Sequence, residues 1–131
     1  AEQIAQMLNC EGWEALTVPI NREFVHADGL VVPLDEKLLV SCLDALEPWV
    51  VDQFKAWGFS FVDVPYREAE NLGVNLVTLG NHKVLSMRGA NEQNAKMRAL
   101  GFQVYDPDMS LLMLGGGGVH CLSKALCRGD V

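Results

Sequence analysis

The sequence predicts an α/β fold built from a repeated strand–strand–helix–strand unit. A glycine followed by alternating apolar and polar residues occurs at residues 12–19 and 58–65, with a looser copy at 101–107. A stretch of helical character precedes each copy, at residues 2–10, 48–57 and 91–100. Two short apolar runs around a polar turn occur at residues 30–40 and again at 76–86. These three patterns recur in the same order along the chain.

Residues typical of helix caps predict where the helices begin and end. A glycine directly after a helical stretch is typical of a left-handed C-cap, and Gly12, Gly58 and Gly101 each hold that position. Pro48 suits the first turn of a helix and Asn91 suits an N-cap. The alternation after each glycine indicates a strand.

The hairpins are predicted by two aligned segments. LVVPLDEKLLV at 30–40 aligns without a gap to LVTLGNHKVLS at 76–86, 46 residues later. Apolar runs on both sides of a short polar turn are typical of a β-hairpin. We therefore expect one domain over residues 1–131. Its units cover approximately 1–19 (incomplete), 24–65, 74–107 and 113–131 (incomplete). The last unit would begin with a strand at residues 118–122.

The incomplete outer units have a consequence for assembly. A repeat fold buries its faces between neighbouring units and needs end pieces that differ from the repeat. We expect the chain either to associate with itself or to be completed by a missing N-terminal half.

The composition excludes several classes of protein. Half of the 131 residues are hydrophobic and 21% are charged, as in a soluble globular domain. The formal net charge of −7 argues against a nucleic acid or an anionic membrane as partner. No apolar stretch reaches the length of a membrane span, and no secretory signal is visible. Four scattered cysteines do not form a disulfide framework, so we expect a cytoplasmic protein.

The run GGGGVHC at residues 115–121 indicates a candidate nucleophile. Glycines permit backbone conformations that other residues avoid, and Gly117 and Gly118 would let a substrate approach Cys121. The alternative is a flexible linker before a structural thiol. If the units surround a pseudo-rotation axis, their starting segments converge, which would bring His26 and Asn75 close to Cys121. A histidine and polar groups are the partners that a thiol nucleophile needs.

Other readings of these polar residues stay open. His26 and Asp28 stand at a strand start, where solvated turn residues are common. If the segment around Cys121 is extended, His120 points to the opposite face, which favours a structural role. His120, Cys121 and Cys127 match no usual zinc spacing, so no metal is expected.

Three motifs, in this order on this repeat, resemble the guanidine-modifying (pentein) superfamily. They are H-A-D at 26–28, N-L-V at 75–77 and G-G-G-V-H-C at 116–121. The superfamily includes arginine:glycine amidinotransferases, arginine deiminases and dimethylargininases. The likeness runs over roughly residues 20–128, and the segments 91–102 and 120–123 look most like the amidinotransferase branch.

The resemblance implies a fold, an α/β propeller of five ββαβ units in a fan around a polar centre. A full member is about twice as long, so this chain would form about half of the fan, its C-terminal half. The carboxylate that usually orients the catalytic histidine would lie in the other half. Ser123 also stands where the family commonly has threonine.

The resemblance also implies residue roles. Cys121 matches the nucleophile that attacks the guanidinium carbon, and His26 matches the general acid/base. Asp28 matches a carboxylate that binds the guanidinium, and Asn75, Gly117 and Gly118 would line the substrate site. Water as acceptor gives a hydrolase and an amine gives an amidinotransferase, with no cofactor in either case.

The sequence therefore leaves two hypotheses for function. The first is the catalytic half of an enzyme acting on an arginine-like guanidine. The second is a non-catalytic half-domain that retains the motif residues and serves in assembly or binding.

Overall fold

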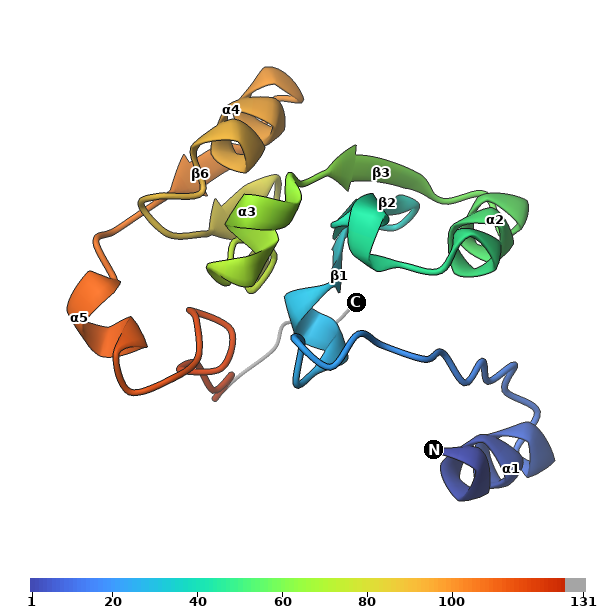
Figure 1. Cartoon of the computed structure of the whole chain (residues 1–131). Coiled ribbons are helices and arrows are strands. Elements are labelled where there is room, and N and C mark those ends of the chain that lie inside the picture. The colour runs from blue at the N-terminus through green and yellow to red at the C-terminus, as the bar shows by residue number, and fades with distance from the viewer. Residues whose placement is uncertain (127–131) are drawn as a thin grey trace.

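Two three-stranded sheets, each with its own helix, form the centre of this mixed α/β structure (Figure 1). The structure is a computed structural model that describes residues 1–126 of the 131. The first sheet contains β1 (Val31–Asp35), β2 (Leu38–Ser41) and β3 (Ser60–Asp63). The second contains β4 (Val77–Gly80), β5 (Lys83–Leu85) and β6 (Gln103–Tyr105). The helices α2 (Pro48–Ala56) and α4 (Asn91–Ala99) connect the second and third strands of each sheet.

The two sheets share one topology. In each, the first two strands form an antiparallel hairpin, and the middle strand pairs in parallel with the strand after the helix. In the first sheet Leu38 lies opposite Ser60, and in the second Lys83 lies opposite Gln103. Both expected hairpins and both expected ββαβ units are therefore present.

The helix ends confirm the predicted caps. Gly12, Gly58 and Gly101 have positive φ angles of 83°, 83° and 90°. Each donates its backbone N–H to the carbonyl three residues earlier, at distances of 2.9 to 3.1 Å. The left-handed conformation that stops each helix is one that glycine adopts without strain.

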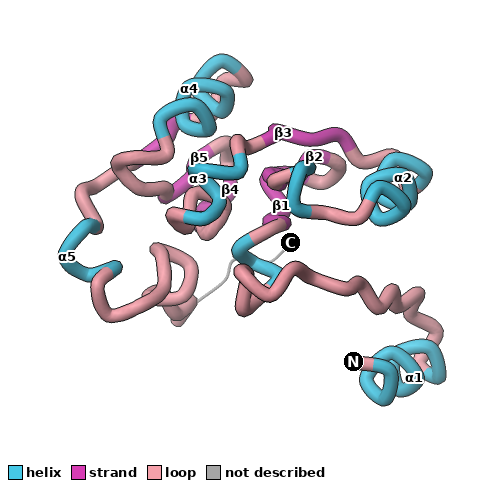
Figure 2. Tube along the Cα trace, in the orientation of Figure 1, coloured by secondary structure: helices cyan, strands magenta, loops and turns pink. Residues whose placement is uncertain are grey.

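The remaining elements are short and lie around the two units. They are α1 (Glu2–Cys10), α3 (Tyr66–Glu70), α5 (Ser110–Met113) and the 3-10 turns η1 (Ala27–Gly29) and η2 (Leu43–Ala45). Long loops join α1 to η1 and follow α5 (Figure 2). Within residues 1–126, no helix is both long and apolar enough to cross a bilayer.

Two predicted strands are absent. Residues 13–19 have no regular secondary structure, and of residues 118–122 the last four form turns. In those turns Leu122 donates its N–H to the carbonyl of Gly118 and Ser123 donates to that of His120, both at 3.1 Å. A strand needs a neighbour to accept its backbone hydrogen bonds. In the part of the chain that is described, neither segment has one. The unit expected over 113–131 is described only as far as Leu126.

Candidate functional site

Three segments far apart in the sequence meet at one polar cluster. Asp28 lies in η1, Asn75 lies just before β4, and Cys121 lies in the turn after the glycine run. Asn75 Nδ2 donates to Asp28 Oδ2 at 2.9 Å and lies 3.2 Å from Cys121 Sγ. The Cys121 thiol lies 3.7 Å from the same Asp28 oxygen. The starting segments of successive units therefore do converge.

The buried side chain of Asn75 connects the members of this cluster through hydrogen bonds. Only 2% of this residue is exposed. Its Oδ1 accepts the backbone N–H groups of His120 and Cys121, at 3.0 and 3.2 Å. Both ends of the carboxamide are therefore bonded to the protein, so Asn75 fixes the position of the loop that carries the thiol.

The glycine run allows the loop that carries Cys121 to lie directly against Asn75. A Cβ atom on Gly118 would fall 2.6 Å from Asn75 Oδ1, and one on Gly117 would fall 2.8 Å from Cys121 Cβ. Gly117 also has a φ of +92°, a conformation that favours glycine. The sequence pointed to close approach by a substrate, whereas here the groups that approach these two glycines are side chains of the chain itself.

His120 lies on the same side as Cys121, contrary to the prediction. Its Nδ1 is 2.9 Å from Asp28 Oδ2, and its side chain is half exposed. The prediction assumed an extended segment, in which neighbouring side chains alternate. In a turn, consecutive side chains can face one centre. His120 is therefore a site residue that the sequence reasoning missed, and the signal was its direct adjacency to Cys121.

His26 is placed differently from the other expected site residues. It precedes η1 in an extended conformation, and its carbonyl accepts the N–H of Gly29 at 3.1 Å. Its side chain is exposed, and within residues 1–126 it makes no hydrogen bond to Asp28 or Cys121. The structure brings the carboxylate of the H-A-D motif against the thiol, and leaves the imidazole of His26 open to solvent.

The two oxygens of Asp28 have different surroundings. Oδ2 faces Asn75 Nδ2, His120 Nδ1 and the thiol of Cys121. Oδ1 has no hydrogen-bond partner among residues 1–126, and the side chain is 27% exposed. An ionised carboxylate oxygen with unused lone pairs is an acceptor for the N–H groups of a cation.

The three described cysteines have distinct environments. Cys42 is fully buried, and this burial raises the pKa of its thiol, with a further rise from Asp44 and Asp63. Such a thiol is protonated and inert at neutral pH. Cys10 and Cys121 are exposed, but only Cys121 lies in a cluster of polar side chains. Cys127 lies outside the described residues.

Residues 1–128 match the family model of the N,N dimethylarginine dimethylhydrolase, eukaryotic family. The chain belongs to this family. Among curated relatives of the chain is an uncharacterized protein, YkgA of Bacillus subtilis, which is 26% identical over 113 residues. That match covers 86% of this chain and 39% of YkgA.

Solved structures share the fold of this family member. The N-terminal domain of ArgZ, an arginine dihydrolase from cyanobacteria, matches with a TM-score of 0.75 at 21% identity. The match covers 92% of this chain and 44% of that domain, which has been solved with product and with a covalently bound reaction intermediate. SxtG, an amidinotransferase from Microseira wollei, matches with a TM-score of 0.79 at 15% identity, over 99% of this chain and 41% of SxtG. The chain thus spans less than half the length of each protein.

Proposed function

We propose that this chain carries the nucleophile-bearing part of an enzyme that modifies the guanidino group of an arginine-like substrate. The observation that carries the proposal is the convergence of Asp28, Asn75 and Cys121, in which the second oxygen of the Asp28 carboxylate has no hydrogen-bond partner among residues 1–126. Membership of a dimethylarginine hydrolase family and the fold shared with an arginine dihydrolase and an amidinotransferase support it.

Binding begins at Asp28. Its Oδ1 accepts an N–H of the cationic guanidinium, while Oδ2 stays bonded to Asn75 and faces His120. Because the thiol lies 3.7 Å from Oδ2 of the same carboxylate, a guanidinium bound at Oδ1 would bring its carbon toward Cys121 Sγ. The loop that carries Cys121 forms one side of this binding site. It is held in place by Asn75, Gly117 and Gly118, which serve substrate binding in this way. The net charge of −7 also favours a cationic substrate.

The covalent step forms a bond from Cys121 Sγ to the guanidinium carbon. His26 takes the thiol proton of Cys121 as the attack begins. The electron pair of one C–N bond leaves with the departing amine, which receives this proton from the acid/base His26. An amidino-cysteine remains until water or an amine attacks it. His26 then takes a proton from this acceptor, and the C–S electron pair leaves with sulfur, which becomes a thiolate again. The ArgZ domain, solved with a covalently bound intermediate, supports a covalent route. His120, bonded to Asp28, keeps that carboxylate in place during both steps.

The chain supplies about half of the site in this proposal. It covers 39% to 44% of the relatives described above, and we assign it to the C-terminal half of a five-unit fan. The other half would bring the carboxylate that orients the histidine. We place the protein in the cytoplasm, because the spacing of its four cysteines does not match a disulfide framework.

A matched pair of alkylating reagents tests this function without requiring turnover. 2-Chloroacetamidine is a cation shaped like a guanidinium, and 2-chloroacetamide is its neutral counterpart. The rate of modification at Cys121 is measured against that at exposed Cys10 by peptide mass spectrometry. We expect the cationic reagent to favour Cys121 by about tenfold more than the neutral one, because a hydrogen bond to a charged group contributes about 1.5 kcal/mol.

The control variant is Asp28→Asn, which keeps the shape of the side chain and removes its charge. It should lose the preference for the cation while retaining its rate with 2-chloroacetamide. If both reagents give the same ratio of Cys121 to Cys10 modification in the unaltered chain, the site does not recruit a guanidinium-like cation. The chain would then be a non-catalytic assembly or binding module.

A further inference from the structure

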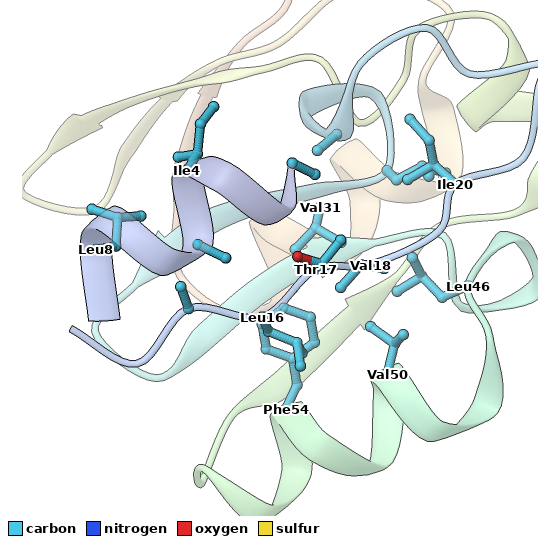
Figure 3. Close-up of a pocket in the computed structure, with 15 residues that line it drawn as sticks. Ile4, Leu8, Leu16, Thr17, Val18, Ile20, Val31, Leu46, Val50 and Phe54 are labelled. Carbon is cyan, nitrogen blue, oxygen red and sulfur yellow. The ribbon is translucent and has the colours of Figure 1, made fainter. Parts of the chain in front are cut away.

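Asp28 lies between an apolar cavity and the polar cluster around Cys121. Ala27 directly before it and Leu30 just after η1 line the cavity, which has a volume of about 430 Å³. Figure 3 shows this cavity beside α1, the segment after it and α2, and none of the side chains that line it carries a charge. Apolar groups do not stabilise a carboxylate. Within residues 1–126, the groups that can balance the charge of Asp28 are therefore those of the polar cluster.

His120 is the member of this cluster that can carry a positive charge. It approaches Asp28 from the turn after the glycine run, and their ion pair is the one that Asp28 makes within residues 1–126. The other ionisable neighbour is Cys121, next to His120 in the same turn, and its thiol is either neutral or negative. Asn75, which comes from the segment before β4, does not titrate. His26, just before η1, has an exposed side chain and makes no hydrogen bond to Asp28 in this part of the chain.

The contact with Asp28 determines which nitrogen of His120 gains a proton. An ionised carboxylate only accepts hydrogen bonds, so the 2.9 Å contact to Asp28 Oδ2 places a hydrogen on Nδ1. The second proton is then gained or lost at Nε2, and the side chain is half exposed, which lets that proton exchange with solvent. Histidine is the side chain that ordinarily changes its charge between pH 5 and 8. The hydrogen bond to Asp28 is thus made by both forms of the ring, and only the charge of the ring differs.

We propose that His120 determines how strongly the site selects a cation, because it competes with the guanidinium for the charge of Asp28. A neutral ring leaves the carboxylate its negative charge, and Asp28 Oδ1 attracts the guanidinium. A protonated ring balances that charge and repels a second cation beside it. The site therefore binds an arginine-like substrate best at a pH where His120 is neutral. This inference rests on the proposed function, since it takes Asp28 as the group that binds the guanidinium.

The preference of Cys121 for 2-chloroacetamidine over 2-chloroacetamide, relative to Cys10, tests this role when it is measured at pH 8 and at pH 5.5. A change in the thiolate fraction of Cys121 affects both reagents alike and cancels in this ratio. An aspartate ordinarily stays ionised at both pH values, and the amidinium stays charged. We expect the preference to fall about fivefold from pH 8 to pH 5.5, as for the loss of one partly exposed ion pair.

Two variants of His120 should abolish this pH dependence in opposite ways. His120→Asn places an amide N–H near the position of Nδ1 but takes no charge, so it should keep the full preference at pH 5.5. His120→Lys is charged at both pH values and should show the reduced preference at both. The matched control is His26→Asn, which should retain the fivefold fall, because His26 does not contact Asp28. Hydrogen exchange at the Cys121 amide should show in each variant that Asn75 still accepts this N–H.

The inference is overturned if the unaltered chain prefers the cation equally at both pH values. It is also overturned if the fall persists in His120→Asn or disappears in His26→Asn. Each of these results leaves the preference at pH 8 in place, and with it the proposed function. Absence of any preference at pH 8 in the unaltered chain would instead refute cation binding at Asp28, and both proposals would then be wrong.

Discussion

Replacing Gly118 with alanine measures how tightly the Cys121 loop is held. The added Cβ would lie 2.6 Å from Asn75 Oδ1 and 3.0 Å from Asn75 Cβ. Asn75 is buried and bonded at both ends of its carboxamide, so it has no room to withdraw. The loop must therefore move instead.

The cost follows from the contacts that this movement breaks. The N–H groups of His120 and Cys121 lose Asn75 Oδ1, at about 0.5–1.5 kcal/mol for each hydrogen bond. Since the loop can detach without unfolding the sheets, we expect the free energy of unfolding to fall by only about 2 kcal/mol. For a chain of this length that lowers the melting temperature by roughly 6–8 °C.

Thermal unfolding by circular dichroism measures this loss, and hydrogen exchange at His120 and Cys121 locates it. Gly115→Ala is the matched control, because its Cβ would meet only the carbonyl of Leu112, at an ordinary 3.5 Å. It should change the melting temperature by less than about 2 °C. If the two variants have the same melting temperature and the His120 amide stays protected in Gly118→Ala, Asn75 does not hold the loop as described.

Two further predictions concern the frame around the site. The hydrogen bond from Tyr66 to the carboxylate of Glu23 raises the pKa of Tyr66 to about 12. The bond therefore contributes stability below the ordinary value of 10, and this is lost as the pH rises toward 12. Glu23→Gln should bring the pKa in an ultraviolet titration back toward 10, and an unchanged titration would contradict the contact. The carboxylate of Glu68 accepts N–H groups of the first turn of α4, at 2.8 and 3.1 Å. Glu68→Gln should therefore lower the free energy of unfolding, measured in urea, by about 1 kcal/mol. The control Glu70→Gln, at an exposed residue, should leave it almost unchanged.

The local elements were predictable because their signals are local. Glycines at residues 12, 58 and 101 stop their helices with the left-handed conformation that the sequence indicated. The polar turns at 36–37 and 81–82 close hairpins between apolar runs. The expected convergence of the unit starts also predicted that Asn75 and Cys121 would be neighbours, and they are. His26 belonged to the same prediction, but among residues 1–126 its side chain makes no hydrogen bond to Cys121.

The remaining features depend on contacts that the sequence does not contain. Residues 13–19 have the alternation of a strand, but a strand forms only beside another strand. The same limit applies to residues 118–122, where a turn replaced the predicted strand and brought His120 round to Asp28. The role of Gly118 was likewise hidden, because its neighbour Asn75 lies 43 residues away in the chain.

The side chain of Asn75 also determines when the thiol reaches its position during folding. Cys121 is joined to the rest of the site by contacts that span 46 and 93 residues, and its segment pairs with no strand of residues 1–126. Closing loops of that length is slow compared with forming a hairpin or a helix. Cys121 should therefore reach its position only after the unit that carries Asn75 has folded. Hydrogen exchange during refolding would then report the last step of assembly, because the amides of His120 and Cys121 gain protection only when Asn75 Oδ1 accepts them.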